Sequence, residues 1–143
     1  MIDDKSLAEQ INKIIEDIWI QIERQERKIV NFKLNTQQYV LLNLIIGYPL
    51  SSPSELAKKM EISKSAISQQ LLKLESEHFI TKIQDPDDKR AYSIGLGEKG
   101  LNYKKELDSF FQHFFDKYYS QFSHEELTNM LLIFQKLKRL LEE

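Results

Sequence analysis

The chain contains no cysteine, and this absence excludes several kinds of chemistry at once. Without cysteine there are no disulfides, no thiolate nucleophiles, no zinc–thiolate centres and no thiol-based redox sensing. The absence is compatible with a reducing compartment, and we expect a cytoplasmic protein. Glycine and proline are also scarce, with 4 and 3 residues among 143. Their scarcity favours long regular elements joined by few loops.

Long apolar runs and a large net charge are missing too. No stretch reaches the ~18 apolar residues of a membrane span, so we expect no membrane partner. The first ten residues are acidic and polar, so no secretory signal is expected there. The net charge is −2, from 20 Lys/Arg against 22 Asp/Glu. An interaction with nucleic acid must therefore be argued from where the charges lie.

Patterns for catalysis and metal binding are weak. His78, His113 and His124 are far apart, none lies in an HxxxH or HExxH spacing, and there is no glycine-rich phosphate loop. We interpret His113 and the nearby Asp116 as a surface or pocket-edge pair. We therefore expect no catalytic residue, no metal site and no cofactor. A small hydrolase or transferase remains a hypothesis without a motif behind it.

Both ends of the chain have helical periodicity. Over residues 5–31 apolar side chains recur on one face, which predicts one long amphipathic helix. After Gly100 come an aromatic-rich segment at residues 110–122 and an amphipathic helix that begins after Ser123. The aromatic run is typical of a core or an oligomer interface, and the long helices need a partner for their apolar faces. We therefore expect a homodimer.

A second helix is predicted from Asn35 to about residue 46. Asn35 and the glutamine three residues later form a capping box, and the apolar residues that follow cover nearly the whole helix surface. This pattern indicates a buried helix. A ligand pocket where it meets the aromatic segment, around Trp19, Tyr39 and Tyr48, is compatible with the pattern.

Two short capped helices follow. Ser52 and Pro53 begin the first, which ends near Met60, and Ser63 begins the next after a short turn. The second helix is expected to bury Ile67 and, on the same face, two leucines one and two turns later. Two capped helices separated by a short turn indicate a helix-turn-helix.

A period of two then replaces the helical period. Residues 79–84 and 91–96 are predicted strands, and the polar loop between them makes a hairpin, in other words a wing. Arg90 is the candidate for entering a minor groove, with Asp88 holding its guanidinium and Lys89 as a cationic neighbour. The three aspartates of the loop favour the alternative, a surface turn whose charged side chains only keep the loop soluble.

Local charge points to the helix-turn-helix as well. From residue 56 to 74 there are four lysines and one glutamate, a local charge of +3 in a chain of net charge −2. Lysines that reach the DNA backbone release counterions, and serine and glutamine can read base edges from a major-groove helix. The alternative is a solvated helix face. The candidate phosphate-binding residues are Lys58, Lys59, Lys64 and Lys73, and the candidate base-reading residues are Ser65, Ser68 and Gln69.

The segment SSPSELAKKMEISKSAISQQLLKLESEHFITKIQDPDDKRAYSIGLGEKG (residues 51–100) resembles the winged helix-turn-helix of MarR-type transcriptional regulators, and the helix pattern of the whole chain is similar too. The most specific part is the wing, where the Asp-x-Arg and Glu-Lys-Gly of the family fall on Asp88, Arg90 and residues 98–100. The resemblance implies an obligate dimer, recognition helices in successive major grooves, and wing arginines in flanking minor grooves. It also implies repression that a small aromatic or anionic ligand relieves.

Three residues depart from the family pattern. His78 replaces a glycine that usually closes the recognition helix, which predicts a strained or differently shaped helix end. Gly97 replaces a Ser/Thr cap, and Gln69 takes a position that is often basic, which leaves the DNA sequence and affinity open.

The sequence thus predicts a mainly α fold with a small β-hairpin, a winged helix-turn-helix plus intertwined terminal dimerisation helices. The expected divisions are a single unit 1–143, with a DNA-binding region at 35–100 and helical dimerisation regions at 1–34 and 101–143. The expected function is a homodimeric regulator, a repressor of a pseudo-palindromic operator in double-stranded DNA. The alternative is a winged-helix protein-interaction module that does not bind DNA.

Overall fold

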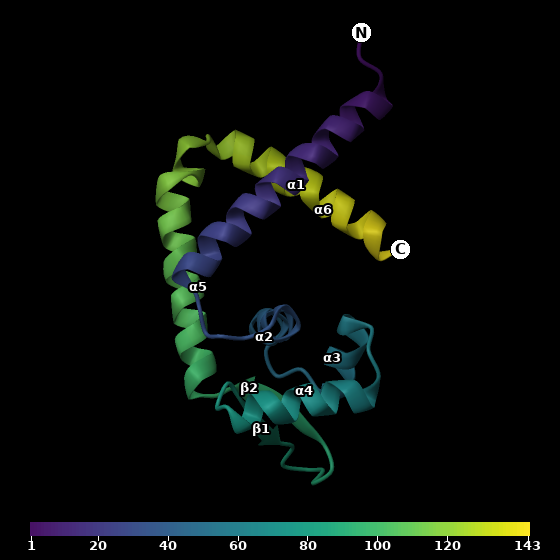
Figure 1. The fold of residues 1–143 in the computed structure, drawn as a ribbon. Coiled ribbons are helices and arrows are strands. Elements are labelled where there is room, and N and C mark those ends of the chain that lie inside the picture. The colour runs from purple at the N-terminus through teal and green to yellow at the C-terminus, as the bar shows by residue number, and fades with distance from the viewer. The chain divides into compact units, whose positions relative to one another are not determined.

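A computed structural model describes all 143 residues, and helices dominate it (Figure 1). The mainly helical fold with one small antiparallel hairpin confirms the predicted fold class. In chain order the elements are α1 (Asp4–Ile29), α2 (Thr36–Gly47), α3 (Pro53–Met60), α4 (Lys64–Ser76), β1 (Ile80–Gln84), β2 (Tyr92–Leu96), α5 (Glu98–Lys117), the 3-10 helix η1 (Tyr119–Gln121) and α6 (His124–Glu142).

The chain forms two compact units, Met1–Leu107 and Asp108–Glu143. The boundary falls inside α5, whose first half belongs to the first unit and whose second half belongs to the second. None of the helices combines the length and the apolar character that a membrane-spanning segment requires.

The core of the first unit is built from α2, α3, α4 and the hairpin. β1 and β2 are antiparallel, with Ile80 opposite Leu96 and Gln84 opposite Tyr92. The Ile94 N–H donates to the Ser51 carbonyl at 2.9 Å, which ties the hairpin to the segment between α2 and α3. The fully buried side chains come from each of these elements and from α5: Leu41, Leu42, Leu56, Ile67, Leu71, Leu74, Ile80, Ile94 and Tyr103.

Side-chain caps define where the short helices begin. Asn35 and Gln38 form the predicted capping box at α2. Ser52 accepts from the Glu55 N–H at α3, and Ser63 accepts from the Ala66 N–H at α4. Each cap satisfies an amide that the helix itself leaves without a partner. These predicted helix starts are confirmed.

The turn between α3 and α4 depends on a left-handed residue. Glu61 has φ 54° and ψ 44°, and its N–H donates to the carbonyls of Ala57 and Lys58. The conformation ends α3 within one residue and lets Ser63 begin α4 two residues later. The expected helix-turn-helix is therefore present.

The end of α4 is closed by His78. Its φ is 67°, the left-handed region that glycine adopts without steric cost, so the strain expected at this departure from the family pattern is present. The Phe79 N–H reaches back to the Leu74 carbonyl at 2.9 Å, which closes the helix end.

The structure explains why residue 97 is a glycine, which the sequence did not indicate. A Cβ at this position would lie 2.6 Å from the His78 carbonyl oxygen, so the glycine permits two backbone segments to meet. The Lys99 N–H donates to the same carbonyl at 2.9 Å, and the Gly97 N–H donates to the Phe79 carbonyl at 2.9 Å. The residue is thus required for this close approach, whatever it costs as a helix cap.

In the second unit aromatic rings pack along the chain. The Phe114 ring centroid lies 5.9 Å from Phe110, 4.7 Å from Tyr118 and 5.5 Å from Tyr119. Ser123 and Glu126 then form a capping box at the predicted start of α6. No residue of α6 is buried.

The other terminal helix is similarly uncovered. α1 is 26 residues long, and Asp3 caps its first turn by accepting from the Ser6 N–H. No residue of α1 is buried, although its apolar stripe includes Leu7, Ile11, Ile14 and Ile18.

Candidate nucleic-acid interface

The two faces of α4 differ sharply in exposure and in chemistry. Ile67, Leu71 and Leu74 are at most 1% exposed and hold the helix against the core. Ser65, Ser68 and Gln69 lie exposed on the opposite face, and their side chains make no hydrogen bond within the chain. Their donors and acceptors are therefore available to base edges.

The predicted lysines lie on α3 and α4. Lys58 and Lys59 occupy the last turn of α3, Lys64 begins α4, and Lys73 lies in its last turn. Lys58, Lys64 and Lys73 form no ion pair in the chain. The Lys59 ammonium differs, because it lies over the Tyr48 ring at 3.7 Å from the centroid. The site therefore offers three unpaired ammonium groups and one that is held by an aromatic ring.

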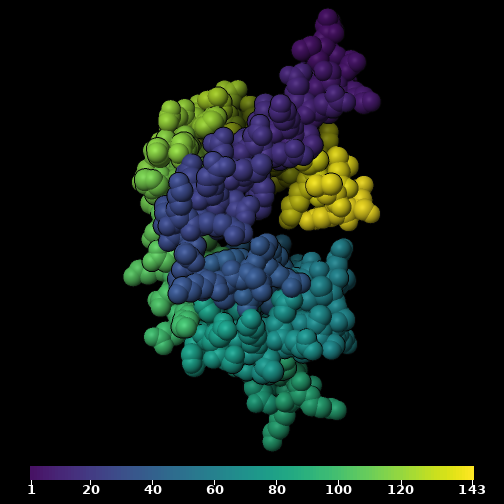
Figure 2. Space-filling model, viewed as in Figure 1, coloured from purple at the N-terminus to yellow at the C-terminus, as the bar shows by residue number.

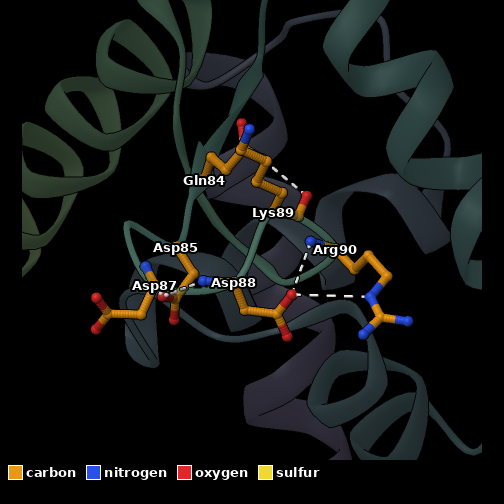
Figure 3. Close-up of polar contacts among 6 residues, drawn as sticks. All are labelled: Gln84, Asp85, Asp87, Asp88, Lys89 and Arg90. Carbon is orange, nitrogen blue, oxygen red and sulfur yellow. Dashed lines mark hydrogen bonds and ion pairs between the residues drawn. The ribbon is translucent and has the colours of Figure 1, made fainter.

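The wing loop is built by its aspartates (Figure 3). The Asp85 carboxylate accepts from the N–H groups of Asp87 at 2.8 Å and Asp88 at 3.2 Å. The Gln84 amide donates to the Lys89 carbonyl at 2.7 Å and closes the loop from the other side. Aspartates that accept from nearby N–H groups are typical of tight turns. The Asp85 carboxylate therefore shapes the loop.

Arg90 extends from this loop into solvent (Figure 3), and its side chain is 96% exposed. The expected contact with Asp88 takes a different form. The Asp88 carboxylate accepts from the Arg90 backbone N–H at 2.9 Å, whereas the guanidinium Nε lies 3.9 Å away. The shorter contact fixes the backbone and leaves the guanidinium available for another anion. The loop projects from the body of the first unit (Figure 2).

The three residues of the predicted ligand pocket have different surroundings. The Tyr39 ring lies 5.8 Å from Tyr103, and its hydroxyl accepts from the Phe32 N–H at 3.1 Å. The Lys59 ammonium lies over the Tyr48 ring, and Trp19 is exposed on α1. The chain alone does not bring the three together, so the pocket stays a prediction.

Tyr103 and Glu26 are the titratable groups with perturbed pKa values. Burial raises the pKa of the Tyr103 hydroxyl well above its usual range, with nearby Glu26 as a further cause. The hydroxyl donates to the Asn43 side chain at 2.8 Å. Burial also raises the pKa of Glu26 from 4.5, Glu23 adds to the effect, and Arg27 opposes it. Neither group lies on the exposed face of α4 or in the wing.

A capped helix pair, a helix with one polar outward face, and a hairpin with a protruding arginine together define the winged helix-turn-helix class. The model of the MarR family matches residues 34–92, which span α2 to the start of β2. Residues 34–92 thus match the MarR family, which is a family of transcriptional regulators.

Comparisons with whole proteins extend the similarity beyond this segment to most of the chain. The chain is 26% identical over 121 residues to the HTH-type transcriptional regulator BilQ of Clostridioides difficile, covering 82% of each protein. The crystal structure of Streptococcus pneumoniae FabT in complex with DNA matches with a TM-score of 0.74 at 19% identity, covering 98% of each chain. Staphylococcus aureus MepR bound to ethidium bromide matches with a TM-score of 0.67 at 21% identity, over 91% of this chain and 95% of that one. These solved structures share the fold.

Proposed function

We propose that the protein is a homodimeric, sequence-specific regulator of transcription that represses a pseudo-palindromic operator in double-stranded DNA. The observation that carries the proposal is the outward face of α4, whose Ser65, Ser68 and Gln69 lack intramolecular partners. Unpaired lysines lie around this face, and the hairpin that packs on α4 presents Arg90. Phosphate contacts, base contacts and a minor-groove contact thus have candidates in one unit.

The proposed dimer rests on the terminal helices. Apolar stripes on α1 and α6 remain exposed in the single chain, and an exposed apolar surface of this extent marks an interaction site. A second copy supplies the same stripes, as an interface with two-fold symmetry requires. The α6 stripe includes Phe134, Leu137 and Leu141.

Selection of bound sequences from random DNA duplexes tests the proposal directly. A two-fold dimer that places two α4 helices in successive major grooves selects inverted half-sites about one helical turn apart, ~10 bp. Recovery of a single half-site, or of no consensus, contradicts the proposal.

Salt dependence separates the proposal from its alternative, a winged-helix module that binds another protein. The acidic wing, with three aspartates against two cations, favours this alternative. A protein that makes 6–10 phosphate contacts loses about 10³–10⁵ in affinity between 50 and 200 mM salt. We expect a loss of this order for the selected duplex, whereas an affinity that does not change with salt favours the protein-interaction module.

Release by a small aromatic or anionic ligand forms a separate part of the proposal. Its support in the chain is a group of three aromatic rings. The ring centroids of Phe32 and Tyr39 lie 5.6 and 5.8 Å from that of Tyr103. MepR, which has the same fold, has been captured with ethidium. Displacement of the labelled operator from the dimer by a ligand library, read by fluorescence anisotropy, tests this part.

A further inference from the structure

One apolar side chain interrupts the polar face of α4. Leu72 is 62% exposed, whereas the other large apolar residues of this helix, Ile67, Leu71 and Leu74, are at most 1% exposed. A single exposed leucine on a protein surface needs no explanation. Its position on the face that we propose to enter the major groove makes this one informative.

Leu72 lies near the centre of that face. It follows Ser65 by seven residues, almost two helical turns, so the two side chains lie in one row about 10 Å apart along the axis. Its helical neighbours at three or four residues are Ser68, Gln69, Glu75 and Ser76. Glu75 is half-buried and pairs with Lys82, and the other three are exposed. Leu72 is thus flanked on its own helix by polar side chains, and it is the one large apolar residue that α4 exposes.

The major groove offers an apolar group that fits such a residue. Among the base edges exposed in that groove, thymine alone carries a methyl group, at C5, and aliphatic side chains contact it. The unpaired Lys64 and Lys73 near the two ends of the helix favour a polyanionic occupant.

We propose that Leu72 contacts a thymine methyl group and specifies a T·A pair in each half-site. The inference rests on the proposed function, because it takes α4 as the helix in the major groove. It adds a base-reading residue that differs from Ser65, Ser68 and Gln69 in chemistry, since it reads shape and apolar surface and donates no hydrogen bond.

Substitution of uracil for thymine tests the contact, because it removes the methyl group and leaves base pairing intact. Each thymine of the selected duplex is replaced in turn, symmetrically in both half-sites, and affinity is measured for the wild type and for Leu72→Ala. At one position we expect uracil to weaken wild-type binding about three- to five-fold per half-site, the effect of one buried methyl group. Leu72→Ala binds the unmodified duplex more weakly and is insensitive to uracil at that position.

Leu101→Ala serves as the matched control, since Leu101 is 57% exposed but lies on α5. It retains the wild-type response to uracil. Circular dichroism and gel filtration of both variants confirm fold and assembly, which the loss of an exposed side chain leaves unchanged. The inference is overturned if uracil affects the wild type and Leu72→Ala equally at every position, or if Leu72→Ala binds like the wild type. If the wild type selects no duplex, the proposed function itself fails.

Discussion

At the scale of single residues, the wing explains how a loop with more acid than base can present a cation. Asp85 and Asp88 accept hydrogen bonds from backbone N–H groups of the loop, so part of their charge is used locally. The guanidinium of Arg90 remains in solvent. A count of charges along the sequence could not separate these roles, because the difference depends on where each carboxylate points.

Arg90→Ala is expected to weaken operator binding by roughly 1–3 kcal/mol and to leave the dimer intact. The reason is the loss of a cation from a narrow minor groove, where negative potential is concentrated. Fluorescence anisotropy measures the affinity and sedimentation velocity the assembly. Lys89→Ala is the comparison, because it removes the neighbouring cation and keeps the backbone carbonyl that closes the loop; we expect it to weaken binding less than Arg90→Ala does. An Arg90→Ala variant that binds like the wild type removes the arginine from the interface.

His78→Gly is expected to raise the free energy of unfolding by about 1 kcal/mol, because a non-glycine residue in the left-handed region is strained by roughly that amount. His78 is exposed, so little packing is lost. Urea unfolding at one fixed protein concentration measures the change. Ser68→Gly, in the interior of α4, is expected to destabilise the protein instead. Destabilisation by both glycines would show that the strain argument is wrong.

Glu26→Gln is expected to make stability less sensitive to pH. The raised pKa of Glu26 means that the folded state holds its proton more tightly than the unfolded chain does. Ionisation above this pKa therefore costs stability in the wild type, a cost that the neutral amide avoids. The variant is more stable than the wild type near pH 7, and the difference disappears below pH 4.5, where both side chains are neutral. A difference that does not vary with pH contradicts the assignment.

At the scale of elements, the sequence predicted most helix starts because caps are local. Asn35, Ser52, Ser63 and Ser123 each needed only the next few residues to be recognised. The hairpin followed from a period of two on either side of turn residues. The predicted exposed face of α4 followed from the spacing of its buried stripe.

Features that depend on distant residues were not predictable in the same way. The need for Gly97 arises from the His78 carbonyl nineteen positions earlier. The contact of Lys59 with the Tyr48 ring of the preceding segment was not predicted, and its phosphate contact stays a prediction. The boundary between the two compact units falls between residues 107 and 108, inside the continuous helix α5, and no local sequence signal marks it. The role that we propose for Leu72 was not predicted, because a stripe pattern at helical spacing assigns no role to an apolar residue off the stripe.

The two serines at the start of α4 provide a matched test of this element. Ser63→Ala removes the cap and is expected to cost about 1 kcal/mol of stability. Ser65→Ala removes an exposed hydroxyl that has no partner in the chain, so it lowers operator affinity and leaves unfolding unchanged within about 0.5 kcal/mol. Thermal unfolding and anisotropy on the same preparations separate the two effects. Equal loss of stability in both variants would place Ser65 in a structural role.

At the scale of the whole molecule, the proposed dimer predicts that Ile11→Glu yields monomers at micromolar concentration. Ile11 lies on the apolar stripe of α1, and a carboxylate buried in an apolar interface is costly. Asn12→Glu places the same charge on the polar side of the same helix and is expected to leave the dimer intact. Sedimentation equilibrium distinguishes the two, and a dimeric Ile11→Glu protein excludes this stripe from the interface.

The backbone hydrogen bonds between the segment that follows α4 and the start of α5 have a mechanical consequence. Lys99 and Gly97 donate to the carbonyls of His78 and Phe79, and no side chain takes part. Gly100, like Gly97, has no room for a Cβ, here because of the Phe79 carbonyl. Because these contacts join backbone to backbone, a change of side-chain rotamer cannot lengthen or shorten them. We therefore expect any bending that changes the direction of α4, the helix that we propose to read DNA, to take place elsewhere in the chain than at this backbone contact.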